Sequence, residues 1–197
     1  MKRQAIVSAA AACAAALTAC GGTGGPAPGP TTTEAVAITF HPCDDLPIDV
    51  IEGLGFIPGG WTRTDREHPW VSHECATANN NRESPGYSTV FSARGMSFQS
   101  VLDDSRLTEY KRTTVDGRDV YFADHSGLEC LVTVDVDPAV FQFTVNYAKN
   151  TTQPDRNFTT IEQACTEAER ILDVILPYVP EQLSNVKQST SFSASPH

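Results

Sequence analysis

The chain has 197 residues, with 14 lysines and arginines against 24 aspartates and glutamates, and a formal charge of −10 at pH 7. An acidic surface repels phosphate backbones, and no basic cluster is denser than Lys111-Arg112, so the composition argues against nucleic acid as a partner. The length suits one domain with its own hydrophobic core.

The first residues have the pattern of an export signal. Lys2 and Arg3 precede an apolar run from Ala5 to Leu17. These 13 residues would span about 20 Å as a helix, which is short of the ~30 Å hydrocarbon core of a bilayer. The run therefore suits a signal peptide better than a permanent membrane span.

The end of this signal predicts a lipid anchor. The residues Leu-Thr-Ala-Cys at 17–20 resemble the bacterial lipobox, in which the cysteine sulfur receives a diacylglyceryl group and the peptide is cut just before it. We expect residues 1–19 to be a lipoprotein signal peptide and Cys20 to be the lipidated first residue. Two or three acyl chains anchor a protein stably, which predicts a location at the outer face of the cytoplasmic membrane. An ordinary secreted protein with an incidental Cys20 is the alternative.

Both ends of the mature chain lack core-forming residues. Residues 21–33 contain only Gly, Pro, Thr and Ala, so we expect residues 20–39 to be a flexible tether that holds the domain on the order of 20 Å from the anchor. Residues 181–197 are predicted to be a disordered tail, which leaves one domain at 40–180. Without residues 1–19 the 14 basic residues become 12 against 24 acidic ones, a charge of −12.

The domain begins with a predicted helix and continues mainly as strands. Asp44 and Asp45 suit the start of a helix over 45–54, and Ser97 suits the N-cap of a second helix over 97–104. β-rich or alternating runs predict strands at 61–66, 70–76, 87–92, 110–115, 120–123, 128–136 and 140–147. Asp116-Gly117 supplies the positive φ angles of a tight hairpin, and the last four runs suggest an antiparallel meander.

The strongest helix signal closes the domain. Thr159-Thr160-Ile161-Glu162 has the pattern of a capping box, and Pro177 ends the run. The apolar residues that recur at helical spacing are Ile161, Ala164, Cys165, Ala168, Ile171, Leu172 and Ile175. Helices at the two ends of the domain and strands in the middle predict an α+β fold, in which an antiparallel sheet packs against those helices.

Cysteine usage predicts two disulfides. Cys13 leaves with the signal and Cys20 carries lipid, which leaves an even set in an oxidising compartment: Cys43, Cys75, Cys130 and Cys165. Three pairings are possible. We expect Cys43 with Cys165, at the first and last helices, and Cys75 with Cys130, in strands. Each bridge would close a long loop, worth roughly 4 kcal/mol.

A zinc site is the competing interpretation of these cysteines. The chain has no C-x-x-C pair, and His68, His73 and Cys75 are not joined by a second ligand cluster at a familiar spacing. We therefore predict no metal.

Short motifs along the domain resemble a known family. They are Pro-Cys-Asp-Asp-Leu at 42–46, Leu-Gly at 54–55, Cys75, Val-Asp-Gly-Arg at 115–118, Cys130 and Ala-Cys at 164–165. Together with the lipobox they resemble the actinobacterial lipoproteins catalogued as domain of unknown function 3558, over about residues 40–180. The resemblance implies an envelope lipoprotein and no particular activity. Members often carry a tryptophan two residues after the second cysteine, where this chain has Thr77.

Catalytic motifs are absent from the sequence, which has no G-x-S-x-G, S-x-x-K, P-loop or G-x-G-x-x-G. Asp103-Asp104 is expected to be a solvated helix end, because neighbours on a helix point about 100° apart. Asp135 and Asp137 flank a turn and suit calcium less well than an ordinary polar hairpin. His125 has no assignable acid partner, so we expect it on the surface.

Three functions remain open. The first is a non-catalytic domain that binds an envelope protein or ligand, with no cofactor. The second is a carrier of a lipid or other apolar envelope molecule, which requires a cavity between sheet and helices. The third is an envelope hydrolase that uses His68, His73 or His125. Trp61 and Trp70 are expected to pack at the core or its rim, with a ligand groove as the alternative.

Overall fold

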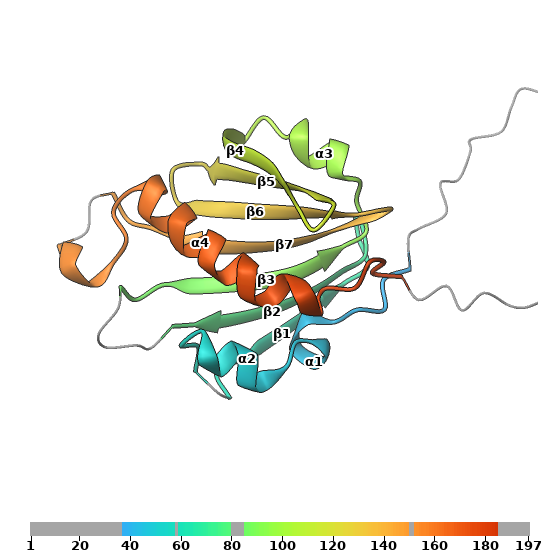
Figure 1. Cartoon of the computed structure of the whole chain (residues 1–197), viewed down its shortest axis with the longest axis horizontal. Helices are drawn as coiled ribbons and strands as arrows, with labels where there is room; N and C mark the ends of the chain where they lie inside the picture. Colours follow the sequence, from blue (N-terminus) through green and yellow to red (C-terminus); the bar gives the residue numbers. More distant parts are fainter. Residues whose placement is uncertain (1–36, 58, 80–84, 150–151, 185–197) are drawn as a thin grey trace, which may run out of the picture. The chain divides into compact units, whose positions relative to one another are not determined.

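The computed structural model describes residues 37–57, 59–79, 85–149 and 152–184 (Figure 1). Its strands are β1 (Thr62–Arg66), β2 (Ser72–Ala78), β3 (Ser88–Arg94), β4 (Leu107–Val115), β5 (Arg118–His125), β6 (Glu129–Val136) and β7 (Ala139–Asn146). The helices are α1 (Pro42–Asp45), α2 (Ile48–Gly53), α3 (Phe98–Leu102) and α4 (Ile161–Ile175), with 3₁₀ turns η1 (Pro154–Arg156) and η2 (Leu176–Tyr178). The predicted α+β class with two disulfides is confirmed.

The seven strands form one antiparallel sheet in the order β1-β2-β3-β7-β6-β5-β4. The expected meander is present, because β4 to β7 are successive neighbours. Asp116 (φ 50°) and Gly117 (φ 79°) close the tight β4–β5 hairpin in the left-handed region. Pairing of β7 with β3, which places Gln142 opposite Ser92, joins the meander to β1–β3.

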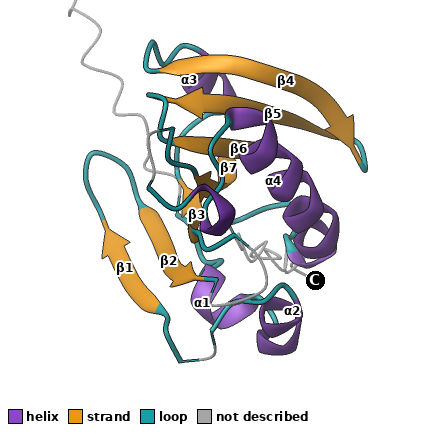
Figure 2. Ribbon diagram, turned by 90° about the vertical axis from the view of Figure 1, so that its left-hand side faces the viewer, coloured by secondary structure: helices purple, strands orange, loops and turns teal. Residues whose placement is uncertain are grey.

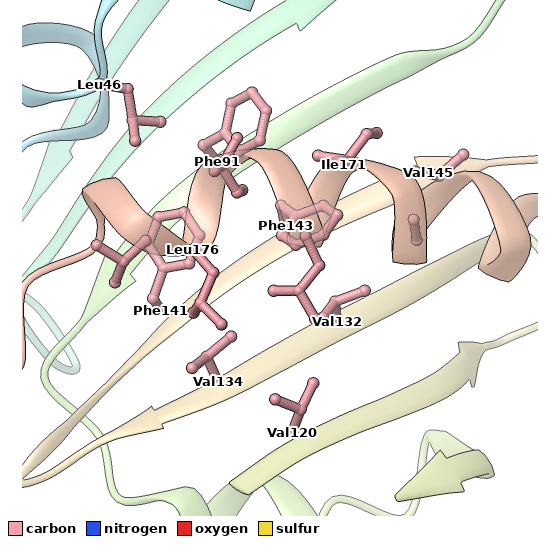
Figure 3. Close-up of a cluster of buried hydrophobic side chains, with 14 of the residues drawn as sticks. Leu46, Phe91, Val120, Val132, Val134, Phe141, Phe143, Val145, Ile171 and Leu176 are labelled. Carbon is pink, nitrogen blue, oxygen red and sulfur yellow. The ribbon is translucent and has the colours of Figure 1, made fainter. Parts of the chain in front are cut away.

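Helix α4 covers one face of the sheet and closes the hydrophobic core (Figure 1). Fully buried side chains on β3, β6 and β7 point toward it, among them Phe91, Val132 and Phe143 (Figure 3). The cap of α4 lies one residue later than predicted. Thr160 accepts a hydrogen bond from the backbone N–H of Gln163, whose side chain accepts one from Thr160.

The single helix predicted over 45–54 is wrong, because the chain forms α1 and α2 with a break at Leu46-Pro47. Leu46 has extended backbone angles (φ −77°, ψ 127°). Proline disfavours the helical region for the residue before it, so the proline ends α1 and starts α2. Leu46 and Ile51 are buried even so.

Both disulfides form, but the predicted pairing is wrong. Cys43 bonds to Cys75 and Cys130 bonds to Cys165, with Cα–Cα distances of 5.2 and 5.3 Å. Each bridge joins a helix to the strands beneath it: α1 packs on β2 and β3, whereas α4 packs on β6 and β7. Because the two helices lie over different strands, Cys43 and Cys165 are not neighbours.

The described structure extends slightly beyond the predicted limits of the domain. Thr39 donates a backbone hydrogen bond to the carbonyl of Leu183 (2.9 Å), and Ile38 and Leu183 are buried. The domain therefore includes residues on both sides of 40–180, and the predicted tail starts too early. The predicted signal peptide, Cys20 and most of the predicted tether and tail lie outside the described residues. Within the described ranges, no helix combines the length and apolarity needed to cross a bilayer.

Candidate functional site

The face of the sheet opposite α4 is covered only in part. Helix α3 packs there through a small cluster in which Val101 meets Tyr121, Ala123 and Val140. Figure 2 shows α3 near the β4–β5 end of the sheet, well apart from α1 and α2. The sheet beside α3 is therefore left accessible, and a hollow forms between the helix and the strands.

This hollow, which we call the sheet-face pocket, has a volume of about 480 Å³. Strand alternation provides its floor, because Leu131 of β6 and Gln142 and Thr144 of β7 point away from α4. The remaining lining residues are Trp70, Arg94, Met96, Ser100, Val101, Asp104, Arg106, Leu107, His125 and Glu129. The lining thus combines five apolar side chains with eight polar or charged ones. Apolar walls with polar groups that converge on one cavity are a feature of small-molecule sites.

Two buried polar atoms of the pocket lack hydrogen-bond partners among the described residues. Gln142 is 3% exposed; its Nε2 donates to Thr133 Oγ1 (2.8 Å), but its Oε1 is unpaired. Arg94 donates from Nη2 to Glu74 (3.2 Å), while its Nε is unpaired. A buried polar group without a partner costs about 1–3 kcal/mol. A ligand that forms hydrogen bonds with these two atoms would remove this cost.

The charged groups around the pocket are paired with one another. Arg106 forms a two-point contact with Asp104 (2.6 and 2.9 Å), and these hydrogen bonds lower the pKa of Asp104 to about 2. Glu74 pairs with Arg94, whose pKa is lowered by burial. His125 Nδ1 lies 2.7 Å from Glu129 Oε1. The pocket therefore has no strong net charge.

His125 has an acid partner, Glu129, which was not expected from the sequence. His125 and Glu129 face each other across the β5–β6 hairpin, where they are directly opposed in register. The carboxylate accepts from Nδ1, so the other ring nitrogen is left as the proton acceptor of the neutral ring. An acceptor of this kind can bind a donor or act as a base.

A second cluster joins the start of the domain to the β1–β2 hairpin. Asp65 Oδ1 lies 2.6 Å from His73 Nδ1 and 3.1 Å from His41 Nε2, and the three ligand atoms lie within 4.8 Å of one another. Arg63 pairs with the same carboxylate, and its hydrogen bond is the main reason why the pKa of Asp65 falls to about 2. Asp65, His73 and His41 are therefore candidate ligands of a metal ion.

The hydrogen bonds of His41 leave neither of its ring nitrogens free to bind a metal ion. His41 Nδ1 accepts the backbone N–H of Cys43 (3.1 Å) at the start of α1, so Nε2 must carry the proton that the neutral ring retains. Both nitrogens of His73 face acceptors, Asp65 and the carbonyl of Ile38 (3.2 Å). We therefore assign this cluster a structural role.

The remaining sequence candidates are separated from the sheet-face pocket or from each other. Asp103 accepts from Gln99 Nε2 (2.9 Å) at the end of α3, so it forms no carboxylate pair with Asp104. Asp135 and Asp137 border a shallow acidic hollow, and burial followed by repulsion from Asp137 raises the pKa of Asp135. In the described part of the chain these carboxylates do not meet a third ligand within reach of one ion.

The burial of the two tryptophans and the bonding of Cys75 decide between the alternatives left open for them. Trp61 packs partly buried against the core, as expected, whereas Trp70 is 38% exposed and lines the sheet-face pocket. Cys75 is disulfide-bonded, which removes it from the zinc alternative that combined it with His68 and His73. Arg94 and Gln142 were not predicted from the sequence. The available signal was a glutamine in the middle of the otherwise apolar run of β7.

Comparison with known proteins gives a family and nothing beyond it. A family model described as a protein of unknown function, DUF3558, matches residues 9–178. Neither the curated proteins nor the solved structures gave a match. The matched range covers most of the chain, including every strand and α4. The chain therefore belongs to the DUF3558 family.

Proposed function

We propose that this protein is a lipid-anchored envelope protein whose domain binds an amphipathic molecule, without catalysis, in the sheet-face pocket. The observation that carries the binding part is the unpaired Oε1 of Gln142, buried at the floor of a cavity that also has apolar walls. An orphan acceptor at this depth is stabilised when a ligand donates to it.

The anchor is supported by the sequence around Cys20. The lipobox pattern at residues 17–20 and the run of Gly, Pro and Thr after it favour a diacylglyceryl-modified, actinobacterial lipoprotein at the outer face of the cytoplasmic membrane. The family match begins at residue 9 and so includes this segment. Changing Cys20 to Ala should abolish incorporation of labelled palmitate and move the protein out of the membrane fraction. A Cys20→Ala protein that is still labelled and membrane-bound would overturn the anchor.

The pocket also bears on the alternative of an apolar carrier. A carrier needs a cavity, and the space between α4 and the sheet is filled by fully buried side chains such as Phe141, Phe143 and Ile171. We therefore place cargo in the sheet-face pocket. Its polar floor favours an amphipathic molecule over a plain hydrocarbon.

Binding is favoured over hydrolysis by the bonding of the pocket's side chains. A hydrolase with a serine nucleophile needs that serine in contact with a base. Ser100, the serine of the pocket, donates its hydroxyl to the carbonyl of Ser97 (2.6 Å) instead of to His125. His73 belongs to the structural cluster near the N-terminal end of the domain.

Native mass spectrometry of the protein extracted from its own membranes tests the proposal. We expect a small molecule bound to the wild-type protein and absent from Leu131→Trp, which fills the pocket floor. Val174→Trp is the matched control, because Val174 is exposed on α4. Thermal melting checks that each variant is folded. Ligand-free wild-type protein, or a ligand retained equally in Leu131→Trp, would contradict binding at this site.

A further inference from the structure

We infer that the sheet-face pocket recognises an amide group of its ligand, held between Arg94 and Gln142. This inference rests on the proposed function and adds the chemical class of the group that is bound. It is carried by the pairing of an unused donor, Arg94 Nε, with an unused acceptor, Gln142 Oε1, in one cavity.

The sheet register brings the two side chains together. In the β3–β7 ladder Ser92 lies opposite Gln142 and Arg94 opposite Val140, so Arg94 and Gln142 are diagonal neighbours on the face that α4 leaves uncovered. Diagonal neighbours are about 7–8 Å apart, within reach of long side chains. One planar amide placed between Arg94 Nε and Gln142 Oε1 would form a hydrogen bond of about 2.9 Å to each of these atoms.

The types of free atom select the amide. Its carbonyl oxygen accepts from Arg94 Nε, and its N–H donates to Gln142 Oε1, so both unpaired atoms are satisfied by one planar group. A carboxylate or phosphate would suit Arg94 but would place an anionic oxygen against Gln142 Oε1. An ester has an acceptor but no donor. An alcohol has both functions on one oxygen, which must then lie within bonding distance of both side chains.

The electrostatic environment agrees with a neutral group. Arg94 is already paired with Glu74, and Arg106 with Asp104. Arg94 is half-buried, and this burial lowers the pKa of its guanidinium. A second anion next to Glu129 and Glu74 would not be compensated by any unpaired cation among the residues that line the pocket.

The apolar part of the ligand has its own place. Trp70, Met96, Leu107 and Leu131 line the same cavity. A hydrocarbon chain attached to the amide can lie along these side chains, so the ligand class is an amide with an apolar substituent.

A series of probes that share a chain of eight carbons tests the inference by isothermal titration calorimetry. The protein is the chain from Gly21 to His197, which contains all of the described residues; these belong to one compact unit that begins after Thr33. The probes are octanamide, octanoate, 1-octanol and methyl octanoate, which differ only at the polar end. We expect octanamide to bind at least tenfold more tightly than each of the others.

Variants assign the effect to the two side chains. Gln142→Leu should weaken octanamide about tenfold and leave methyl octanoate unchanged, whereas Gln99→Leu, on the exposed part of α3, should change neither. Arg94→Lys keeps the charge beside Glu74 but lacks the Nε donor, and should also weaken octanamide. Gln142→Leu removes the hydrogen bond to Thr133 and could destabilise the protein. In that case Arg94→Lys is the independent test of the amide contact.

The outcomes separate this inference from the proposed function. If no probe binds, the binding function itself fails at this site. If the probes bind equally, or octanoate or 1-octanol binds best, the pocket binds ligands but the amide assignment is wrong. Unchanged octanamide binding in Arg94→Lys would also overturn it.

Discussion

Replacing Cys130 and Cys165 together by alanine tests how the sheet is joined to α4. The bridge closes a loop with a sequence separation of 35 residues. In the chain-entropy model a loop of this length removes about 13 cal/mol/K from the unfolded chain, so its loss should lower the free energy of unfolding by about 4 kcal/mol at 25 °C. Domains are typically stable by about 5–15 kcal/mol, so this is a large fraction of the total.

Urea unfolding of the chain from Gly21 to His197, followed by circular dichroism, measures the loss. Both cysteines are fully buried and alanine leaves no unpaired polar atom, so the loop term should dominate. The double variant Cys43→Ala/Cys75→Ala is the matched comparison, because its separation of 32 residues predicts nearly the same loss. A loss below about 1 kcal/mol for Cys130→Ala/Cys165→Ala would refute the loop argument.

The pairing itself is tested by counting thiols under denaturing, non-reducing conditions. The variant Cys43→Ala/Cys165→Ala removes one half of each bridge and should expose two free thiols, at Cys75 and Cys130. The variant that removes Cys130 and Cys165 should expose none. The opposite result would restore the pairing expected from the sequence.

Two further predictions concern the core and the N-terminal cluster. Phe143→Ala, which removes a fully buried ring 5.8 Å from that of Phe91, should cost about 3–5 kcal/mol in urea unfolding, and a loss below about 1 kcal/mol would show that the space beneath α4 refills. Asp65→Asn should lower stability at neutral pH. Because the pKa of Asp65 is about 2 in the folded protein and 3.8 in the reference state, the wild-type advantage should be full above about pH 4 and disappear as the pH falls through 2. Unfolding curves from pH 2 to 6 check this, and an advantage that persists unchanged at pH 2 would contradict it.

Local signals in the sequence predicted most of the strands and helices. The Asp116-Gly117 turn and the apolar spacing of α4 are properties of neighbouring residues, and both are found where they were expected. The break at Pro47 was also a local signal, but the apolar spacing across 45–54 suggested one continuous helix. The proline's effect on Leu46 decides the outcome.

Features that depend on which strands are neighbours could not be obtained in this way. The sequence showed that four cysteines would pair, but the pairing depends on α1 lying over β2 and α4 over β6. The sheet-face pocket is similarly non-local, because Arg94 and Gln142 meet only through the β3–β7 ladder. His125 and Glu129 were closer to prediction, since they flank one hairpin, and the turn between them determines their contact.

The Cys43–Cys75 bridge has a mechanical consequence. A force applied to the chain before Ile38 meets first the backbone hydrogen bonds of Thr39 and Phe40 to Leu183 and then α1, which is a single turn that hydrogen bonds alone would hold weakly. The disulfide passes this load directly to β2, which is bonded on both sides by β1 and β3. Peeling α1 away from the domain therefore requires rupture of a covalent bond, and reducing conditions should make the domain much easier to unravel from its N-terminal end.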